Sequence, residues 1–128
     1  MDEQSKMPKI LIIDDDPFIL DMYVLKFKER GFDVESARDG QEGIKKAEDY
    51  KPDAILLDVV MPALDGFDVL EKIKNDPKMR SIKTILLTNL GQKEEVERGT
   101  ALGADEYIIK AHFTPSEVVE KVKKLLER

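Results

Sequence analysis

The sequence predicts an α/β domain in which helices cover both faces of a doubly wound parallel sheet. Short apolar runs alternate with amphipathic segments along the whole chain, which is typical of a parallel sheet enclosed by helices. The chain has 128 residues, 41% of them hydrophobic, which is enough for one sizeable core but too short for two typical domains. We therefore expect one domain over residues 8–128, preceded by a flexible N-terminal segment over residues 1–7.

The strands are expected in the short apolar runs. The first of these, ILII, leads directly into three consecutive aspartates. The five expected strands are Lys9–Ile13, Asp33–Ser36, Ala54–Asp58, Ile82–Thr88 and Glu106–Lys110.

The first two helices have clear end signals. Asp16 is expected to cap the first helix, with Pro17 at its first position and Gly31 ending it. The second covers about Gly40–Tyr50 and is ended by Pro52.

Two later helices are amphipathic. The third follows MPALDG, where Asp65 is expected to be its cap. The last begins at Thr114, with Pro115 next and Glu117 completing a capping box. The inward-facing residues are Val69, Leu70 and Ile73 in the third helix, and Val118, Val119, Val122, Leu125 and Leu126 in the last.

The fourth helix, about Gln92–Leu102, is expected to be held weakly. Its apolar residues are few, Gly99 interrupts it, and its exposed side is nearly all charged. Helices that bury little surface move at low cost.

Charge and composition exclude several classes of function. The net charge of -6 argues against general binding to nucleic acid or to anionic membranes. The absence of cysteine excludes disulfides and thiolate metal sites. No segment approaches the roughly 18 apolar residues of a membrane span. We expect a soluble cytoplasmic protein that binds a cation or a basic partner, and neither nucleic acid nor membrane.

The residues at the strand ends indicate phosphoryl chemistry. Asp14 and Asp15 follow the first strand, and Asp58, Thr88 and Lys110 end the third, fourth and fifth. Ligands bind beyond the carboxyl ends of the strands in such sheets. If the second strand lies at an edge of the sheet, the strands that can reach a common site are the first, third, fourth and fifth, which are the strands that carry these residues. Neighbouring carboxylates are costly to bury without a cation, and they suit Mg²⁺. A carboxylate can also attack phosphorus, aided by a lysine and a hydroxyl donor.

With these residues the chain resembles the receiver domain of two-component response regulators, including the single-domain receivers of chemotaxis. The motifs are IIDDDP, LLDVVMPALDG, ILLT and YIIK, and the resemblance covers about residues 8–127. It implies a flavodoxin-like (βα)5 sandwich with strand order 2-1-3-4-5. It also implies a phosphoprotein of a phosphorelay rather than an enzyme, with only Mg²⁺-dependent self-phosphorylation and slow self-dephosphorylation.

The resemblance implies a role for each acidic residue. Asp58 accepts a phosphoryl group from the phosphohistidine of a sensor histidine kinase or a histidine phosphotransfer protein. Asp15, Asp58 and the backbone carbonyl of Val60 bind Mg²⁺ directly, and Asp14 binds it mainly through water. Lys110 pairs with Asp58 and then with the phosphoryl oxygens.

The resemblance also implies a switch. Thr88 turns toward the phosphoryl group and Tyr107 moves inward, so that the fourth helix, the fifth strand and the last helix present an altered face to a downstream protein, whose identity stays open. The protein is then a monomer or a phosphorylation-dependent dimer. Because no effector domain follows residue 128, it acts by binding a partner, passes its phosphoryl group on in a relay, or is part of a longer chain.

Two positions near the site depart from the family pattern. Ala111 follows Lys110 where the family has a proline with a cis peptide bond. The geometry of this loop, and with it the orientation of the Lys110 side chain, therefore stays open. Asn89 replaces a small residue, so that it narrows access to Asp58 or contacts the phosphoryl group.

Val60 and Leu90 lie where the family tunes the water that attacks the aspartyl phosphate. Neither side chain can orient a water molecule. We therefore expect an unusually long-lived aspartyl phosphate.

Other functions fit less well. His112, the one histidine, is more simply a loop residue than a phosphotransfer residue. A phosphatase of the haloacid-dehalogenase kind has a second acid where this chain has Val60, and a flavin phosphate would be repelled by the aspartates at 14–16. Glycine-rich nucleotide-binding loops are absent. The alternative that stays open is a receiver-like interaction module that works without phosphorylation.

Overall fold

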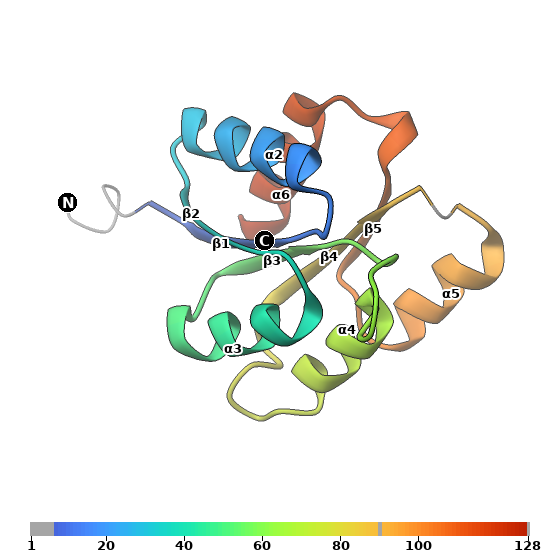
Figure 1. Cartoon of the computed structure of the whole chain (residues 1–128). Helices are drawn as coiled ribbons and strands as arrows, with labels where there is room; N and C mark the ends of the chain where they lie inside the picture. Colours follow the sequence, from blue (N-terminus) through green and yellow to red (C-terminus); the bar gives the residue numbers. More distant parts are fainter. Residues whose placement is uncertain (1–6, 90, 128) are drawn as a thin grey trace.

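Strands and helices alternate along the chain (Figure 1). The computed structural model describes residues 7–89 and 91–127. The strands are β1 (Lys9–Ile13), β2 (Asp33–Ala37), β3 (Ala54–Leu57), β4 (Lys83–Thr88) and β5 (Glu106–Ile109). The helices are α2 (Pro17–Glu29), α3 (Gly40–Tyr50), α4 (Gly66–Lys74), α5 (Lys93–Ala101) and α6 (Pro115–Leu126), and a 3-10 turn, η1 (Lys110–His112), precedes α6.

The five strands form one parallel sheet in the order β2-β1-β3-β4-β5, which confirms the expected fold. Helices α2 and α6 cover one face of the sheet, and α3, α4 and α5 cover the other (Figure 1). The chain reverses its winding direction between β1 and β3. Their carboxyl ends therefore border the point at which ligands bind in folds of this kind.

Each face of the sheet has its own hydrophobic core. In β1, Ile10 and Ile12 pack toward α2 and α6, whereas Leu11 and Ile13 pack toward α3 and α4. Burial on both faces explains why the strands have apolar runs rather than alternating polarity. Within the described ranges, no helix combines the length and the apolar character needed to cross a bilayer.

The helices that flank the strand ends begin where the sequence predicts. The Asp16 carboxylate accepts hydrogen bonds from the backbone N–H groups of Phe18 (2.9 Å) and Ile19 (3.3 Å) at the start of α2. Asp65 forms a capping box at the start of α4, and Thr114 forms the predicted box with residue 117 at the start of α6. These caps satisfy backbone donors that the first helical turns leave unpaired. They fix the points at which the chain enters α2 and α4, beside the ends of β1 and β3.

Two phenylalanines on α2 make a matched pair for testing its buried face. Phe27 is fully buried and meets the Phe32 ring edge-on, with 4.9 Å between ring centroids, whereas Phe18 is 84% exposed. We expect Phe27→Ala to lower the free energy of unfolding by about 3–5 kcal/mol, and Phe18→Ala to change it by less than about 0.5 kcal/mol. Urea unfolding followed by circular dichroism measures both. Equal losses would contradict the assignment of the buried face.

Candidate functional site

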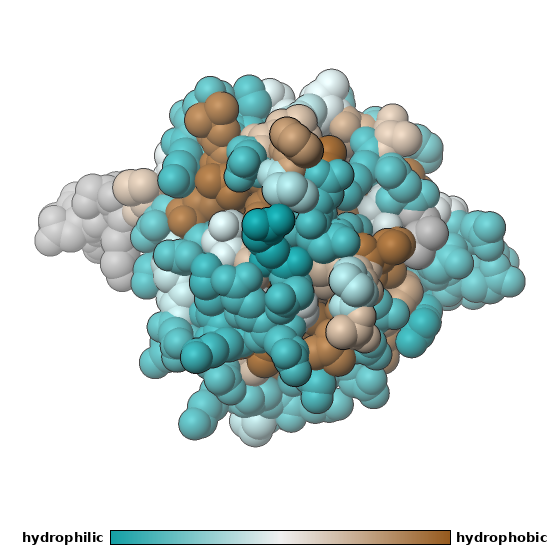
Figure 2. Space-filling view, in the orientation of Figure 1, coloured by the Kyte–Doolittle hydropathy of each residue, from teal (hydrophilic) through white to brown (hydrophobic). Residues whose placement is uncertain are grey.

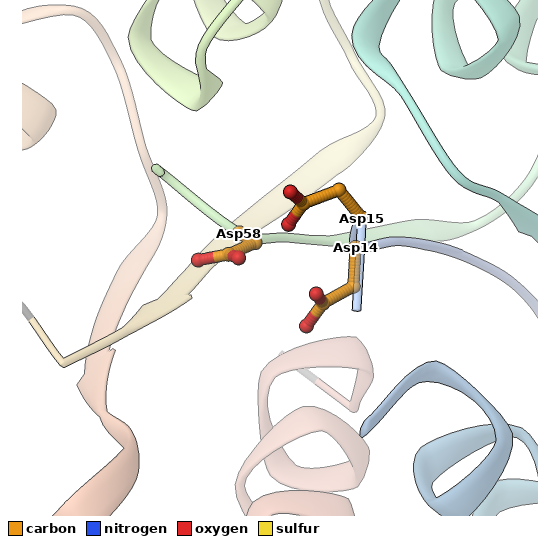
Figure 3. A group of neighbouring side chains, drawn as sticks. All are labelled: Asp14, Asp15 and Asp58. Atoms are coloured by element: carbon orange, nitrogen blue, oxygen red, sulfur yellow. The ribbon is translucent and has the colours of Figure 1, made fainter. Parts of the chain in front are cut away.

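Three aspartates from two neighbouring strands meet beyond the ends of β1 and β3 (Figure 3). Asp14 and Asp15 follow β1, Asp58 follows β3, and one carboxylate oxygen of each lies within 4.8 Å of the others. Asp14 and Asp58 are buried, and Asp15 is exposed. Oxygens grouped in this way suit a hard cation such as Mg²⁺, which retains several waters. The fold therefore brings together the three acidic residues that the sequence selects.

The parallel pairing of β1 with β3 sets this arrangement. Ile13 is the register partner of Leu57, so the residues that follow them, Asp14 and Asp58, leave the two strands at the same level. The Asp58 N–H donates to the Ile13 carbonyl (2.9 Å), and the Asp14 N–H donates to Ala37 on β2 (3.1 Å). The sheet thus holds the Asp58 backbone, although β3 itself ends one residue earlier than predicted.

Lys110 is the cation that faces these carboxylates. Its Nζ lies 3.2 Å from Asp14 Oδ2 and 3.9 Å from Asp58 Oδ2. The closer partner is therefore Asp14, whereas the resemblance implied Asp58. Lys110 begins the η1 turn, and the described residues contain no cis peptide bond, so Ala111 follows it in the trans form. The turn directs the lysine toward the carboxylates without the proline that the family pattern has.

Asp14 is engaged at both of its carboxylate oxygens. Oδ1 accepts a hydrogen bond from the backbone N–H of Asp16 (2.9 Å), and Oδ2 accepts one from Lys110 Nζ (3.2 Å). The Asp14 side chain therefore stabilises the turn between β1 and α2 and also orients the Lys110 side chain. This double engagement suits contact with a cation through water better than direct ligation.

Asp58 is the carboxylate whose titration is most altered. Burial raises its pKa, and the negative charges of Asp14 and Asp15 raise it further, whereas Lys110 and a hydrogen bond from the Val60 N–H lower it. The result is a pKa of about 6, compared with an ordinary value of 3.8. At neutral pH the carboxylate is ionised, desolvated and only partly compensated, which favours the arrival of positive charge or of an electrophile.

Gly66 is a positioning residue that sequence reasoning left without a role. Its N–H donates to the Val59 carbonyl at 2.8 Å. A Cβ at this position would meet the Asp58 carbonyl oxygen and would lie 2.7 Å from Val59 Cα. Only glycine lets α4 begin this close to the segment after Asp58. The signal in the sequence is the Asp65-Gly66 pair, seven and eight residues beyond Asp58.

The predicted switch residues lie on β4 and β5. Thr88 ends β4 and is buried. Tyr107 lies on β5 and is half-buried; burial raises its pKa, and the nearby Glu95 carboxylate adds to the rise. Asn89 is exposed at the end of β4, and Leu90 lies outside the described residues.

The remaining predicted residues lie in loops. Val60 is 59% exposed, two residues beyond Asp58. His112 is exposed in η1, in agreement with its interpretation as a loop residue.

The larger surface hollows lie away from this chemistry. One, of about 850 Å³, lies between Glu48 of α3, one side of α4 and the loop that follows α4. The other, of about 760 Å³, lies between the end of α3 and the loop that leads into β4. A smaller one, of about 330 Å³, lies beside the segment that follows Asp58, and we call it the α4–α5 hollow. It is lined by Val59, Val60, Met61, Asp65, Phe67, Glu95 and Arg98.

Exposed apolar side chains gather over α2, at the top of the molecule in Figure 2. Phe18, Met22 and Leu25 are the exposed large apolar residues of this helix. Their spacing of four and three residues places them on one side of α2. Because α2 begins just after Asp15 and Asp16, this stripe starts at the border of the site.

Comparison with known proteins identifies relatives over nearly the whole chain. Residues 10–123 match the family described as the response regulator receiver domain. The chain is 40% identical over 122 residues to the DNA-binding transcriptional regulator RpaA of Synechocystis, covering 95% of this chain and 50% of that protein. It is 40% identical over 120 residues to the regulator PhoP of Bacillus subtilis, with coverages of 94% and 49%. The chain thus spans about half the length of these curated relatives.

Solved structures share the fold as well. A chemotaxis protein of Vibrio cholerae matches with a TM-score of 0.88 and 28% identity, covering 94% of this chain and 99% of that one. A response regulator from Chloroflexus aurantiacus matches with a TM-score of 0.89 and 31% identity, covering 96% and 100%.

The raised pKa of Asp58 predicts a pH-dependent effect of Asp58→Asn in metal-free buffer. Between about pH 4 and pH 6 the folded protein keeps a proton on Asp58 that the unfolded chain has lost, so the wild type loses stability relative to the variant as pH rises. We expect the stability of Asp58→Asn relative to wild type to increase by about 2–3 kcal/mol between pH 4 and pH 7.5. Urea unfolding in EDTA measures this, with Asp21→Asn as an exposed-charge control. A difference that stays flat with pH would contradict the expectation.

Proposed function

Because this chain belongs to the response regulator receiver family, we propose that it is a cytoplasmic phosphoacceptor of a two-component phosphorelay, with residues 8–128 as the receiver domain. Asp58 accepts a phosphoryl group from the phosphohistidine of a sensor histidine kinase or a histidine phosphotransfer protein. The observation that carries the proposal is the convergence of Asp14, Asp15 and Asp58 with Lys110 at the end of the sheet.

The residues present fit a Mg²⁺ ion. Three carboxylate oxygens lie close together, and the buried Asp58 has only partial compensation from Lys110. Asp15, Asp58 and the backbone carbonyl of Val60 would hold the ion, with Asp14 acting through water because both of its oxygens are engaged. When bound, Mg²⁺ supplies positive charge to the oxygens of the phosphoryl group.

The transfer step needs little covalent chemistry from the protein. A carboxylate oxygen of Asp58 forms the new O–P bond while the N–P bond of the donor phosphohistidine breaks, and the electron pair of that bond stays on the imidazole nitrogen. The product is an acyl phosphate. Lys110 lies 3.9 Å from the Asp58 carboxylate, within reach of the phosphoryl oxygens, where it stabilises the transferred charge. Positioning and charge are the main contributions to such reactions.

Phosphorylation then changes the balance of charge at the strand ends. It adds about one and a half to two negative charges and three acceptor oxygens. The Thr88 hydroxyl turns toward these oxygens, and Tyr107 moves into the space behind it. The face formed by α5, β5 and α6 follows as a shift between populated states. The small buried area of α5, where Gly99 is the one buried residue of the helix, supports its role as the moving element.

The partners that fit this surface are proteins. The apolar stripe of Phe18, Met22 and Leu25 on α2 borders the site, where a protein carrying a phosphohistidine must approach. The downstream target is a protein that reads the α5–β5–α6 face, with the receiver as a monomer or a phosphorylation-dependent dimer. The net charge of -6 supports this rather than direct contact of the receiver with nucleic acid.

A small phosphodonor such as acetyl phosphate tests the proposal. With Mg²⁺ present we expect intact mass spectrometry to show a gain of one phosphoryl group, because Asp58 is then ionised, compensated and reachable. The gain should vanish in Asp58→Asn and in EDTA. If the wild type gains no mass with any donor, the chain is instead the phosphorylation-independent interaction module that the trans Lys110–Ala111 bond and Asn89 leave open.

The lifetime of the aspartyl phosphate provides a second test. Val60 borders Asp58, is 59% exposed and has no polar group to orient an attacking water. We expect slow loss of the phosphoryl group in Mg²⁺, and faster loss in Val60→Gln. Val60→Ala is the matched control, since it opens space without adding a polar group. Loss within seconds in the wild type, unchanged when Val60 and Leu90 are both made polar, would contradict this expectation.

A further inference from the structure

Helix α5 lies directly on two paired residues of the sheet. Leu86 and Tyr107 are register partners on β4 and β5. Gly99 packs closely against both side chains, since a Cβ at residue 99 would lie 2.7 Å from Leu86 Cδ1 and 3.1 Å from Tyr107 Cδ2. Glycine weakens a helix interior relative to alanine. Its presence here therefore allows a close contact rather than strengthening the helix.

One turn earlier on the same helix, Glu95 carries a buried oxygen without compensation. Its Oε1 is inaccessible to solvent and has no hydrogen-bond partner among residues 7–89 and 91–127. Gln92, which precedes the helix, makes no side-chain cap. Leaving a buried acceptor unpaired costs free energy that the same group would not lose in water. The packed position of α5, in which Gly99 lies against Tyr107, therefore includes an unfavourable contribution from Glu95.

Glu95 also connects the two regions that phosphorylation is proposed to couple. It lines the α4–α5 hollow together with Val60, which follows the phosphoacceptor, and its charge acts on Tyr107. Arg98 lines the same hollow, but its guanidinium lies over the Phe67 ring, 4.4 Å from the ring centroid, and leaves Glu95 Oε1 unpaired. The Glu95 side chain is therefore close to the loop after Asp58 and also acts on Tyr107 of β5.

We propose that Glu95 regulates the output face by weakening the packed position of α5, so that the helix moves in response to a small change at Asp58. The inference deepens the proposed function and rests on it only in treating α5 as part of the output face. Gly99 permits close packing of α5, and Glu95 opposes it. The two together keep the packed and displaced positions close in free energy, which a switch needs if a local ligand is to shift it.

Hydrogen–deuterium exchange of the α5 amides, measured on the unphosphorylated full chain, tests this. Glu95→Met replaces the unpaired carboxylate with an apolar side chain of similar length. We expect exchange in residues 93–101 to slow by about 5-fold to 100-fold, in line with removal of an unpaired buried acceptor. Glu94→Met is the matched control, because Glu94 is exposed and both glutamates lie in the first helical turn. Exchange in that variant should not slow.

Gly99→Ala provides the opposite perturbation. Its Cβ would meet the end of the Leu86 side chain and the Tyr107 ring, so either these side chains or α5 must shift. We expect the closest packing of α5 to be lost and its amides to exchange faster than in the wild type. Unchanged or faster exchange in Glu95→Met, or equal slowing in Glu94→Met, would overturn the proposal.

Intact mass after incubation with acetyl phosphate separates this inference from the proposed function. If Glu95→Met gains a phosphoryl group as the wild type does but shows a smaller change in α5 exchange, the regulatory role is supported. An identical change in both proteins would overturn that role. If neither protein gains mass, the proposed function fails, whereas the exchange of the unphosphorylated variants still decides whether Glu95 weakens the packing of α5.

Discussion

The repulsion among three neighbouring carboxylates is the constraint on which this structure depends. The register of Ile13 with Leu57 brings the acidic ends of β1 and β3 together, and one lysine, bound more closely to Asp14 than to Asp58, offsets part of the charge. The sheet is otherwise covered by apolar side chains on both faces. The domain therefore places three neighbouring carboxylates at one edge of the sheet, where the arrival of a cation would offset their repulsion.

Much of the fold was predictable because its signals are local. The caps at Asp16, Asp65 and Thr114 depend on residues within one helical turn, and the apolar runs identify strands that are buried on both faces. The strand order came from family resemblance, since no local signal encodes it. The gathering of the acidic residues followed from their place at strand ends together with that order.

The details that sequence reasoning missed depend on contacts between distant segments. The preference of Lys110 for Asp14 is set by the η1 turn and by the level at which β1 ends. The closeness of Gly66 to the Asp58 carbonyl, and the unpaired oxygen of Glu95, arise where helices meet the sheet. A glycine or a glutamate in an amphipathic helix has the same appearance in the sequence whether it is exposed or pressed against a strand.

The sheet separates two hydrophobic cores, so that the buried side of α2 and the loop after Asp58 lie on opposite faces of it. The loop after Asp58, the Tyr107 ring and the apolar residues of α4 belong to the core beneath α3 and α4, whereas α2 and α6 pack into the other core. Substitutions on the exposed side of α2 do not alter the residues of the core beneath α3 and α4. In the function proposed above, the exposed side of α2 can therefore change its protein contacts while the core around the loop after Asp58 keeps its residues, which would separate recognition of partners from switching during evolution.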